Sequence, residues 1–311
     1  MIPYTLRQLE VFTSIAKASS LSEAANTLFL SKAATSLALN ELEKQLGHTL
    51  FDRINNRLVL NQEGSKLLPV ADEVLNRARD ISSLLSNEKI LSGELKLGAS
   101  NTIGNQLLPI LIRDFNQSHQ ANIEFTIELS NSLELANKVI DYQLDMAFIE
   151  SGEDSDKLSR SPFGHDKMCV ICSIDSPLLS LQTPTLTDLE DHHWIMRESG
   201  SGSRDYFTQH IANNLQTWHK RFELNSSEAI ITSVSAGLGL ACLSELSVET
   251  AIKAGKVSKL ELSLPQDRGM QLVLHRDKYL NPLLSAFKTF ALAWRLDDQL
   301  ANPASRLDCN E

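Results

Sequence analysis

Apolar residues recur at helical spacing through the first fifty residues of this chain, in three short stretches separated by polar breaks. From Thr5 to Ala18 they stand three and four residues apart, which predicts an amphipathic helix with one buried stripe. A second short helix is expected from Ser22 to Leu28, with Ser22 as its N-cap. A third is expected from its N-cap Ser31 to Gly47, a residue type that commonly ends helices.

A hairpin is predicted directly after these helices. The stretches Leu50 to Arg53 and Arg57 to Leu60 alternate apolar and polar residues around Asn55-Asn56, a pair that tolerates positive φ. Three short helices followed by such a hairpin predict a winged helix-turn-helix, whose third helix places its early residues against base edges in the major groove. The predicted inward face of that helix consists of Ala34, Leu39, Leu42 and Leu46. The residues expected to contact DNA are Ser31, Lys32, Thr35, Ser36 and Asn40 on the helix, with Arg53 and Arg57 of the wing facing phosphates.

A longer series of residues agrees in order and spacing with one family. The series comprises Leu6-Arg7-Gln8-Leu9 with Phe12, Ala24-Ala25 with Leu28, Ser31, Ser36, Leu42-Glu43, Leu46-Gly47, Leu50-Phe51-Asp52-Arg53, Leu60 and Glu63-Gly64. It resembles the winged helix-turn-helix of LysR-type transcriptional regulators, and the resemblance implies a double-stranded DNA operator as partner. The family usually has Gln-Pro after the capping serine, where this chain has Lys32 and Ala33. The base sequence of the operator therefore cannot be carried over from relatives.

A single long helix is expected from Asn61 to about Leu85. At 1.5 Å per residue it would span about 40 Å, too long to be buried within its own small domain. One apolar stripe has the three- and four-residue spacing of a two-helix coiled contact, while Leu68 and Leu75 on a second stripe are suited to packing on the preceding helices. The family resemblance implies that the first stripe forms a dimer, and that dimers pair into tetramers. The first stripe consists of Leu67, Ala71, Val74, Ala78, Ile81 and Leu85.

Beyond Ser92 and Gly93, strand-like runs alternate with helical ones, which predicts an α/β fold with a mainly parallel sheet. The order repeats after the middle of the chain, so we expect two similar lobes, with Pro162 to Ile174 and Gly269 to His275 crossing between them as a pair. This pattern resembles a periplasmic solute-binding protein, the fold of the LysR effector domain. The expected division is 1–64 for the winged helix-turn-helix, 65–91 for the linker helix and 92–311 for the effector domain. Lobe I would hold 92–162 and 269–311, and lobe II would hold 163–268.

Two polar loops, 99–104 and 198–204, each follow a predicted strand and precede a helix, one in each lobe. In such folds ligands occupy the cleft at the carboxyl ends of the strands, where N–H groups and hydroxyls favour anions. From the residues alone, helix capping and turn formation explain these loops better, and the family resemblance reverses that order. The candidate effector-binding residues are Ser100, Asn101, Thr102, Glu150, Ser151, Ser199, Gly200, Ser201, Gly202 and Ser203.

The segments SNTIGNQLLP, from Ser100 to Pro109, and RESGSGSR, from Arg197 to Arg204, also resemble the branch of the family related to regulators of cysteine and sulfur assimilation. This resemblance implies a small anionic effector, with a sulfur oxyanion such as sulfite or sulfate as the first expectation. An organic acid is the second expectation.

Composition limits the remaining classes of function. The net charge is −10, yet residues 1–91 carry ten basic and ten acidic side chains, so the acidity lies in the remainder and moderate nonspecific DNA affinity is expected. No apolar run approaches the eighteen or so residues that cross a bilayer, and the N-terminus lacks the pattern of a secretory signal, so we expect a cytoplasmic protein without membrane contact.

No catalytic set, cofactor or metal is expected. Cys169 and Cys172 have redox-motif spacing but lie in a predicted strand, where residues three apart point to opposite faces. His192 and His193 are adjacent, which does not suit one metal ion. The competing hypothesis is a ligand-binding or enzymatic α/β protein whose N-terminal helices only mediate dimerisation, and DNA binding discriminates between the two.

Overall fold

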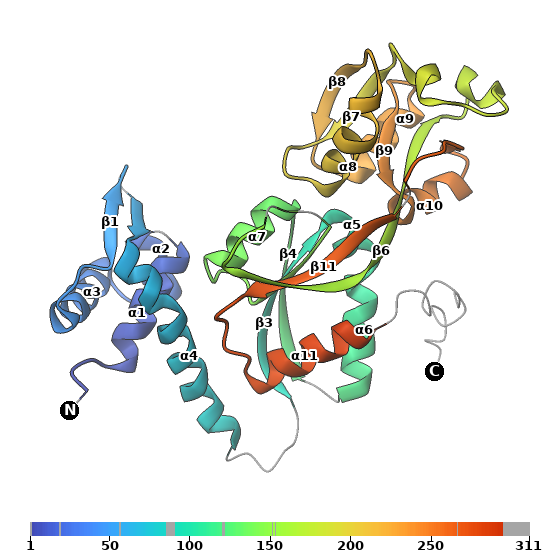
Figure 1. Ribbon diagram of the computed structural model, residues 1–311. Coiled ribbons are helices and arrows are strands. Elements are labelled where there is room, and N and C mark those ends of the chain that lie inside the picture. Colours follow the sequence, from blue (N-terminus) through green and yellow to red (C-terminus); the bar gives the residue numbers. More distant parts are fainter. Residues whose placement is uncertain are drawn as a thin grey trace.

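The computed structural model describes residues 2–18, 20–55, 57–84, 91–119, 122–150, 152, 154–265 and 267–294 of the 311-residue chain. Two of the predicted site residues, Leu85 and Ser151, lie outside the described residues. Figure 1 shows an N-terminal helical module, the long helix α4 and two α/β lobes joined by a pair of crossing strands.

The N-terminal module (residues 2–60) holds three helices and a hairpin. The helices are α1 (Leu6–Ala18), α2 (Leu21–Thr27) and α3 (Lys32–Leu46). The strands β1 (Phe51–Ile54) and β2 (Arg57–Leu60) pair antiparallel, as the wing requires. Ser31 caps α3 by accepting a hydrogen bond from the Ala34 N–H at 3.1 Å, and Gly47 ends it with φ of +74°. The predicted N-cap of α2 was wrong: Ser20 accepts from the Glu23 N–H, because the helix already begins at Leu21 and Ser22 lies within its first turn.

Helix α4 (Gln62–Leu84) begins after Asn61, whose side-chain oxygen accepts a hydrogen bond from the Gly64 N–H at 2.9 Å. Leu68 and Leu75 are buried in the core of the N-terminal module, as predicted. Ala71 is buried with them, only 1% exposed, so its assignment to the intermolecular stripe was wrong. Ala71 stands between the two apolar stripes in sequence, and the packing of α4 on α1 decides which one it joins. The apolar residues that α4 leaves exposed or half-buried are Leu67, Val70, Val74, Ala78 and Ile81.

Lobe I is built on three parallel strands, with β3 (Ser92–Ser100) between β4 (Asn122–Ser130) and β5 (Met146–Ile149). Its core gathers around Phe115, Phe148 and Phe287. The helical stretch after β3 is divided at Leu107, because Pro109 lacks the N–H that a continuous helix would use there. The helices of lobe I are α5 (Asn101–Gln106), α6 (Leu108–His119), α7 (Ser132–Ile140) and α11 (Pro282–Ala293).

Lobe II has a separate core around Trp194 and Phe207. Strands β7 (His193–Arg197) and β8 (His219–Leu224) pair in parallel, while β9 (Ala241–Ser244) and β10 (Val257–Leu260) pair with a crossing strand. Its helices are α8 (Gly202–His210), α9 (Ser227–Ser235) and α10 (Glu245–Lys253). Short 3-10 helices span Pro177–Ser180, Leu186–Leu189 and Ala212–Asn214.

The crossing strands are β6 (Leu158–Ser173) and β11 (Asp267–His275), which pair antiparallel over the whole length of β11 (Figure 1). The prediction of two extended segments crossing as a pair is confirmed. Because both crossing strands pair antiparallel with their neighbours, the seven-stranded sheet is mixed rather than mainly parallel.

The two cysteines with redox-motif spacing both lie on β6. Cys169 lies in one core cluster of lobe II and Cys172 in the other, on opposite faces, as predicted. Burial raises the pKa of Cys169 to about 12, which leaves its thiol protonated and unreactive at neutral pH. Across the described part of the chain, no helix is both long and apolar enough to cross a membrane.

Candidate functional site

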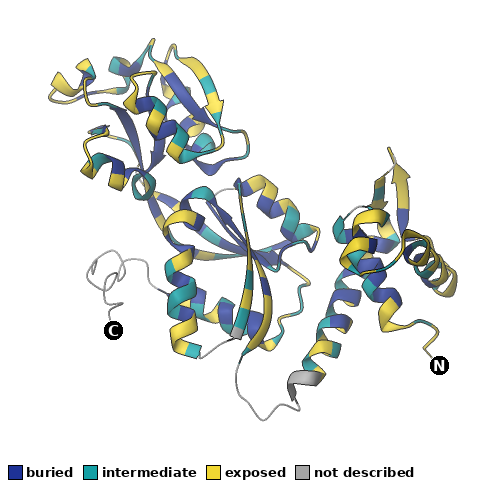
Figure 2. Cartoon of the chain, turned by 180° about the vertical axis from the view of Figure 1, so that it is seen from behind, coloured by how far each residue is buried: buried dark blue, intermediate teal, exposed yellow. Residues whose placement is uncertain are grey.

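The outer face of α3 is the surface that a helix-turn-helix would present to DNA, and Figure 2 shows it largely exposed. Ser31, Lys32 and Asn40 are exposed and Ser36 is half-buried, near the start of the helix where base contacts are expected. Two predictions for this helix were wrong. Thr35 is fully buried and its hydroxyl donates to the Ser31 carbonyl at 3.0 Å, while Ala34, expected inside, is exposed.

Apolar side chains also occur on this exposed face. Leu37 is 60% exposed, and the methyl groups of Ala33 and Ala34 are exposed beside the start of the helix. Hence the buried stripe of α3 runs through Thr35, Leu39 and Leu42, and the exposed face combines hydrogen-bonding and apolar groups.

The wing carries both predicted arginines, and both are exposed. Arg53 stands opposite Leu58 and Arg57 stands opposite Ile54 in the antiparallel ladder. Cross-strand partners share a face and neighbouring pairs alternate, so the two arginines project from opposite faces of the wing. The Glu43 carboxylate accepts a hydrogen bond from the Leu50 N–H at 2.7 Å, which ties α3 to the base of the wing.

A small, nearly closed cavity lies between the lobes, where the carboxyl ends of β3 and β4 meet the start of α8. In this arrangement of the lobes the cavity leaves no space for a water molecule, so an ion can enter it only when the lobes move apart. The Ser100 hydroxyl is buried there and has no hydrogen-bond partner among the residues that the structure describes. Ser201, at the start of α8, likewise makes no capping hydrogen bond. The lining residues are Ser100, Asn101, Ser130, Asn131, Ser132, Glu150, Arg197, Ser201, Gly202 and Ser203.

A larger cavity of about 640 Å³ adjoins this one and shares Glu150 and Gly202 with it. Ser199 and Gly200, two further predicted residues, line this larger cavity. Thr102 is buried in the first turn of α5 and lies outside the walls of both cavities. The structure thus gathers most of the predicted residues at the interlobe cleft, in two adjoining spaces.

Arg268 is the charged centre behind the small cavity. Its guanidinium pairs with Asp166, lies 3.5 Å from the Glu150 carboxylate and donates to the Ser203 hydroxyl at 3.2 Å. Burial would lower the pKa of Arg268, but the carboxylates of Glu150 and Asp166 outweigh burial and raise it, so the guanidinium stays charged. Glu150 also accepts from the Ser132 hydroxyl at 3.2 Å. Glu150 therefore has its own partners within the wall.

The second buried arginine of the wall is paired as well. Arg197 donates twice to the Glu198 carboxylate, both distances being 2.8 Å, and its side chain is only 4% exposed. The charges of both arginines are balanced by carboxylates, and the Leu133 and Glu134 N–H groups of α7 already donate to Gly200 and Asn131. Attraction for an anion must therefore come chiefly from hydroxyls and from the N–H groups at the start of α8.

The lobes touch beside this cavity. The Leu133 N–H donates to the Gly200 carbonyl at 3.2 Å, and the Asn101 side chain donates to the Asn225 carbonyl at 3.3 Å. Gly200 has φ of +83°, and an added Cβ would lie 2.9 Å from the Leu133 Cβ. Glycine is thus required here both by its backbone conformation and by the closeness of the other lobe.

Several residues of the cleft wall were not predicted, among them Asn131, Ser132, Arg197 and Arg268. Asn131 and Ser132 directly follow β4, as Asn101 directly follows β3, so the carboxyl-end rule applied to the neighbouring strand would have found them. Arg268 stands out in the sequence as a charged residue within a strand whose alternate residues are buried. Within the described ranges, no three His, Cys, Asp or Glu side chains gather as a metal site.

Comparisons with known proteins match both parts of the chain. Residues 6–65 match the family described as bacterial regulatory helix-turn-helix protein, lysR family, and residues 89–295 match the LysR substrate binding domain. The chain is 37% identical over 286 residues to the uncharacterized HTH-type transcriptional regulator YeiE of Escherichia coli, covering 91% of this chain and 95% of YeiE.

Two solved structures show the same fold. A full-length OxyR variant from Pseudomonas aeruginosa aligns with a TM-score of 0.72 at 23% identity, covering 94% of this chain and 95% of that one. The effector binding domain of QuiR in complex with shikimate aligns with a TM-score of 0.59 at 23% identity, covering 65% of this chain and 96% of that one.

The helix-turn-helix with its wing and the two-lobed domain are therefore the DNA-binding domain and the effector-binding domain of one regulator. This chain is a member of the LysR family of DNA-binding transcriptional regulators.

Proposed function

We propose that the effector of this regulator is a small oxyanion bound in the small cavity between the lobes, which must move apart to admit it. The observation that carries this proposal is the Ser100 hydroxyl, which is buried in the cavity wall with no hydrogen-bond partner in the described part of the chain. A buried polar group without a partner costs free energy, and an anion that accepts its hydrogen bond removes that cost.

A sulfur oxyanion is our first proposal for the effector's identity. Sulfite and sulfate are small and can accept hydrogen bonds on several sides, where Ser100, Ser201 and the first N–H groups of α8 lie. The balanced wall charges favour recognition by hydrogen bonds over recognition by a single ion pair.

A small carboxylic acid is the second candidate, and the adjoining 640 Å³ cavity favours it. A carboxylate could take the oxyanion position while the carbon skeleton extends toward Tyr206 and Leu133. The complex of QuiR with shikimate, a carboxylate, shows that this fold can hold such a ligand in another protein.

On the output side, we propose that Lys32, Ser36 and Asn40 read base edges. Lys32 can donate to guanine acceptors in the major groove. The exposed methyl groups of Ala33 and Leu37 suit contact with thymine methyl groups. Arg53 and Arg57, on opposite faces of the wing, would contact phosphates on separate stretches of backbone.

We further propose that α4 pairs with α4 of a second copy. The stripe Leu67, Val70, Val74, Ala78 and Ile81 proceeds by three- and four-residue steps, the spacing of a coiled contact. Val70 and Ile81 are 56% and 59% exposed in the single chain, which leaves this apolar stripe to be covered by a partner. Val70 thus replaces Ala71 in the stripe predicted from the sequence.

Sulfite or sulfate should raise the melting temperature of the full-length protein, and Ser100→Ala should abolish the rise. The physical reason is that binding to the folded state alone stabilises it, by about 2.7 kcal/mol at a hundredfold excess over Kd. Thermal unfolding with a panel of sulfite, sulfate, phosphate and small carboxylates measures this. Thr102→Ala, outside the cavity wall, is the control and should keep the shift. If no anion of the panel stabilises the protein, the anion proposal is wrong.

Arg53→Ala should weaken DNA binding for all sequences alike, because a phosphate contact carries no base information. The logarithm of the binding constant should then fall less steeply with the logarithm of salt concentration, by about 0.9 per lost phosphate contact. Titrations of a fragment from the protein's own upstream region at several salt concentrations measure the slope. An unchanged slope would exclude a phosphate contact by Arg53.

Lys32→Ala should instead change which sequences are preferred. Loss of a base contact costs about 1 to 3 kcal/mol at the base pair concerned and little elsewhere. Selection from a random DNA library with the wild-type protein and the variant compares the preferred bases. If both proteins select the same sequences with the same spread at every position, Lys32 does not read a base.

Val74→Glu should convert the oligomer to smaller species, because it places a charge in the centre of the proposed apolar seam. Sedimentation analysis across a concentration series measures the change. Ser65→Glu, on the opposite exposed side of α4, is the matched control and should leave the assembly intact. Equal assembly of the Val74 variant and the wild type would contradict the seam.

A further inference from the structure

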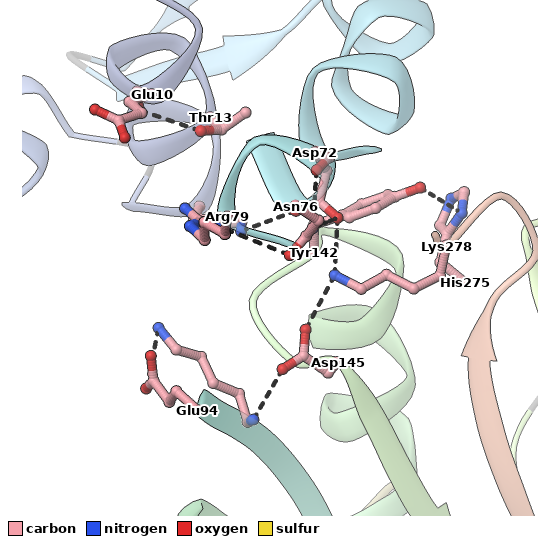
Figure 3. A network of polar contacts seen from close by, with 12 residues as sticks. Glu10, Thr13, Asp72, Asn76, Arg79, Glu94, Tyr142, Asp145, His275 and Lys278 are labelled. Carbon is pink, nitrogen blue, oxygen red and sulfur yellow. Dashed lines mark hydrogen bonds and ion pairs between the residues drawn. The ribbon is translucent and has the colours of Figure 1, made fainter. Parts of the chain in front are cut away.

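Polar contacts join the DNA-binding module to lobe I of its own chain, and Figure 3 shows this network from close by. Tyr142, just after α7 of lobe I, is 3% exposed and packs within the hydrophobic cluster of the DNA-binding module. Its hydroxyl is 2.9 Å from the His275 Nδ1 atom. Gln143 donates from its side chain to the Lys17 carbonyl at 2.9 Å. Tyr142 of the effector domain thus completes the hydrophobic core of the DNA-binding module.

A buried ion-pair network lies at the same surface. The Lys278 ammonium is 2.9 Å from Asp72 of α4 and 3.0 Å from Asp145 of lobe I, and Asp72 also pairs with Lys17 of α1 at 3.3 Å. The side chains of Lys278 and Asp72 are only 4% and 5% exposed. Together we call Lys17, Asp72, Tyr142, Asp145, His275 and Lys278 the reader-lobe junction.

The charges of this junction depend on both modules. Burial would lower the pKa of Lys278, but Asp145 and Asp72 outweigh burial and raise it. Burial would raise the pKa of Asp72, but Lys278 and Lys17 outweigh it and lower it. Removing one partner of a buried pair leaves an uncompensated charge, which is strongly unfavourable. The ion pairs of the junction should therefore form together and break together. This favours two discrete orientations of the DNA-binding module on lobe I over a continuous range of orientations.

The elements that form the junction also reach the effector cleft. Strand β11 has Arg268 near its cleft end and His275 at its junction end, about 23 Å apart at 3.3 Å per residue. Strand β5 lies between Asp145 at the junction and Glu150 at the cleft. Helix α7 begins with Ser132 in the cleft wall and ends just before Tyr142. The same rigid elements therefore end at both sites.

We propose that the reader-lobe junction positions the DNA-binding module on lobe I, and that the effector changes DNA binding through it. Lys278, Asp72 and Tyr142 are positioning residues: they act on DNA through the orientation of α3. The effector part of this inference rests on the anion proposed above, whereas the positioning part rests on DNA binding alone. An effector shifts the equilibrium only by binding one arrangement better than the other.

The first test measures positioning without any effector. Fragments carrying two half-sites, selected with the wild-type protein, are compared with the same fragments after two base pairs are inserted between the half-sites. If the DNA-binding module is held in a fixed orientation, the wild-type protein should bind the selected spacing much more tightly than the lengthened one. Lys278→Met should reduce the ratio of the two Kd values by at least about fivefold, the lower range of usual coupling effects. Affinity for a single half-site should stay at the wild-type value, which a merely unfolded reader would not show.

Two controls accompany this test. Lys278→Arg keeps the charge and should restore the spacing preference. Glu63→Gln removes a carboxylate from an exposed ion pair with Lys66 on the same helix and should change nothing. If Lys278→Met does not fold, Gln143→Ala removes one contact to Lys17 and should show a smaller reduction in the same direction. An unchanged spacing preference in a folded Lys278 variant overturns the positioning role.

The second test uses sulfite as the probe. In the wild type, sulfite should change the Kd for the selected fragment, and in Lys278→Met it should still raise the melting temperature but no longer change that Kd. A variant in which sulfite acts on DNA binding as in the wild type would overturn the transmission role. If sulfite neither binds nor acts in the wild type, the effector proposal fails, while the spacing experiment still decides the junction.

Discussion

The antiparallel pairing of β6 and β11 is the constraint on which the arrangement of the effector domain depends. Arg268 on β11 stands directly opposite Asp166 on β6, and their side chains form a buried ion pair where the strands pass from one lobe to the other. A slip of one strand by one residue would place Arg268 and Asp166 on opposite faces of the sheet and separate the pair. The pair therefore fixes the register, and the register fixes which residues of each lobe face the cleft.

The sequence predicted much of this fold because periodicity and caps are local. The helices α1 and α3, the wing and the crossing pair follow from spacing, and Ser31 and Gly47 follow from the chemistry of helix ends. Thr35 shows where local rules fail. Its type is polar, yet its hydroxyl is satisfied by a carbonyl one turn earlier, so its methyl group can pack inside and the neighbouring alanine stays outside. Polarity alone could not decide which of the two residues is buried.

The site was predicted in part for a similar reason. Ser100 and the 199–203 loop follow from the carboxyl-end rule, whereas Arg268 reaches the cleft only through the pairing of strands distant in sequence. Ala71 could belong to either apolar stripe of α4, and the packing of α4 on α1 assigned it to the reader. In both cases the missing information is tertiary: which surface an element covers.

The close approach at Gly200 has a consequence for how sensitive such a sensor is. The two lobes meet there backbone to side chain, with no room for one added methyl group beside Leu133. A side chain at this position would act as a wedge that favours separated lobes, without altering any hydroxyl of the small cavity. If an effector binds in this cleft, the concentration at which it acts would depend partly on Gly200, a position that contributes no side chain.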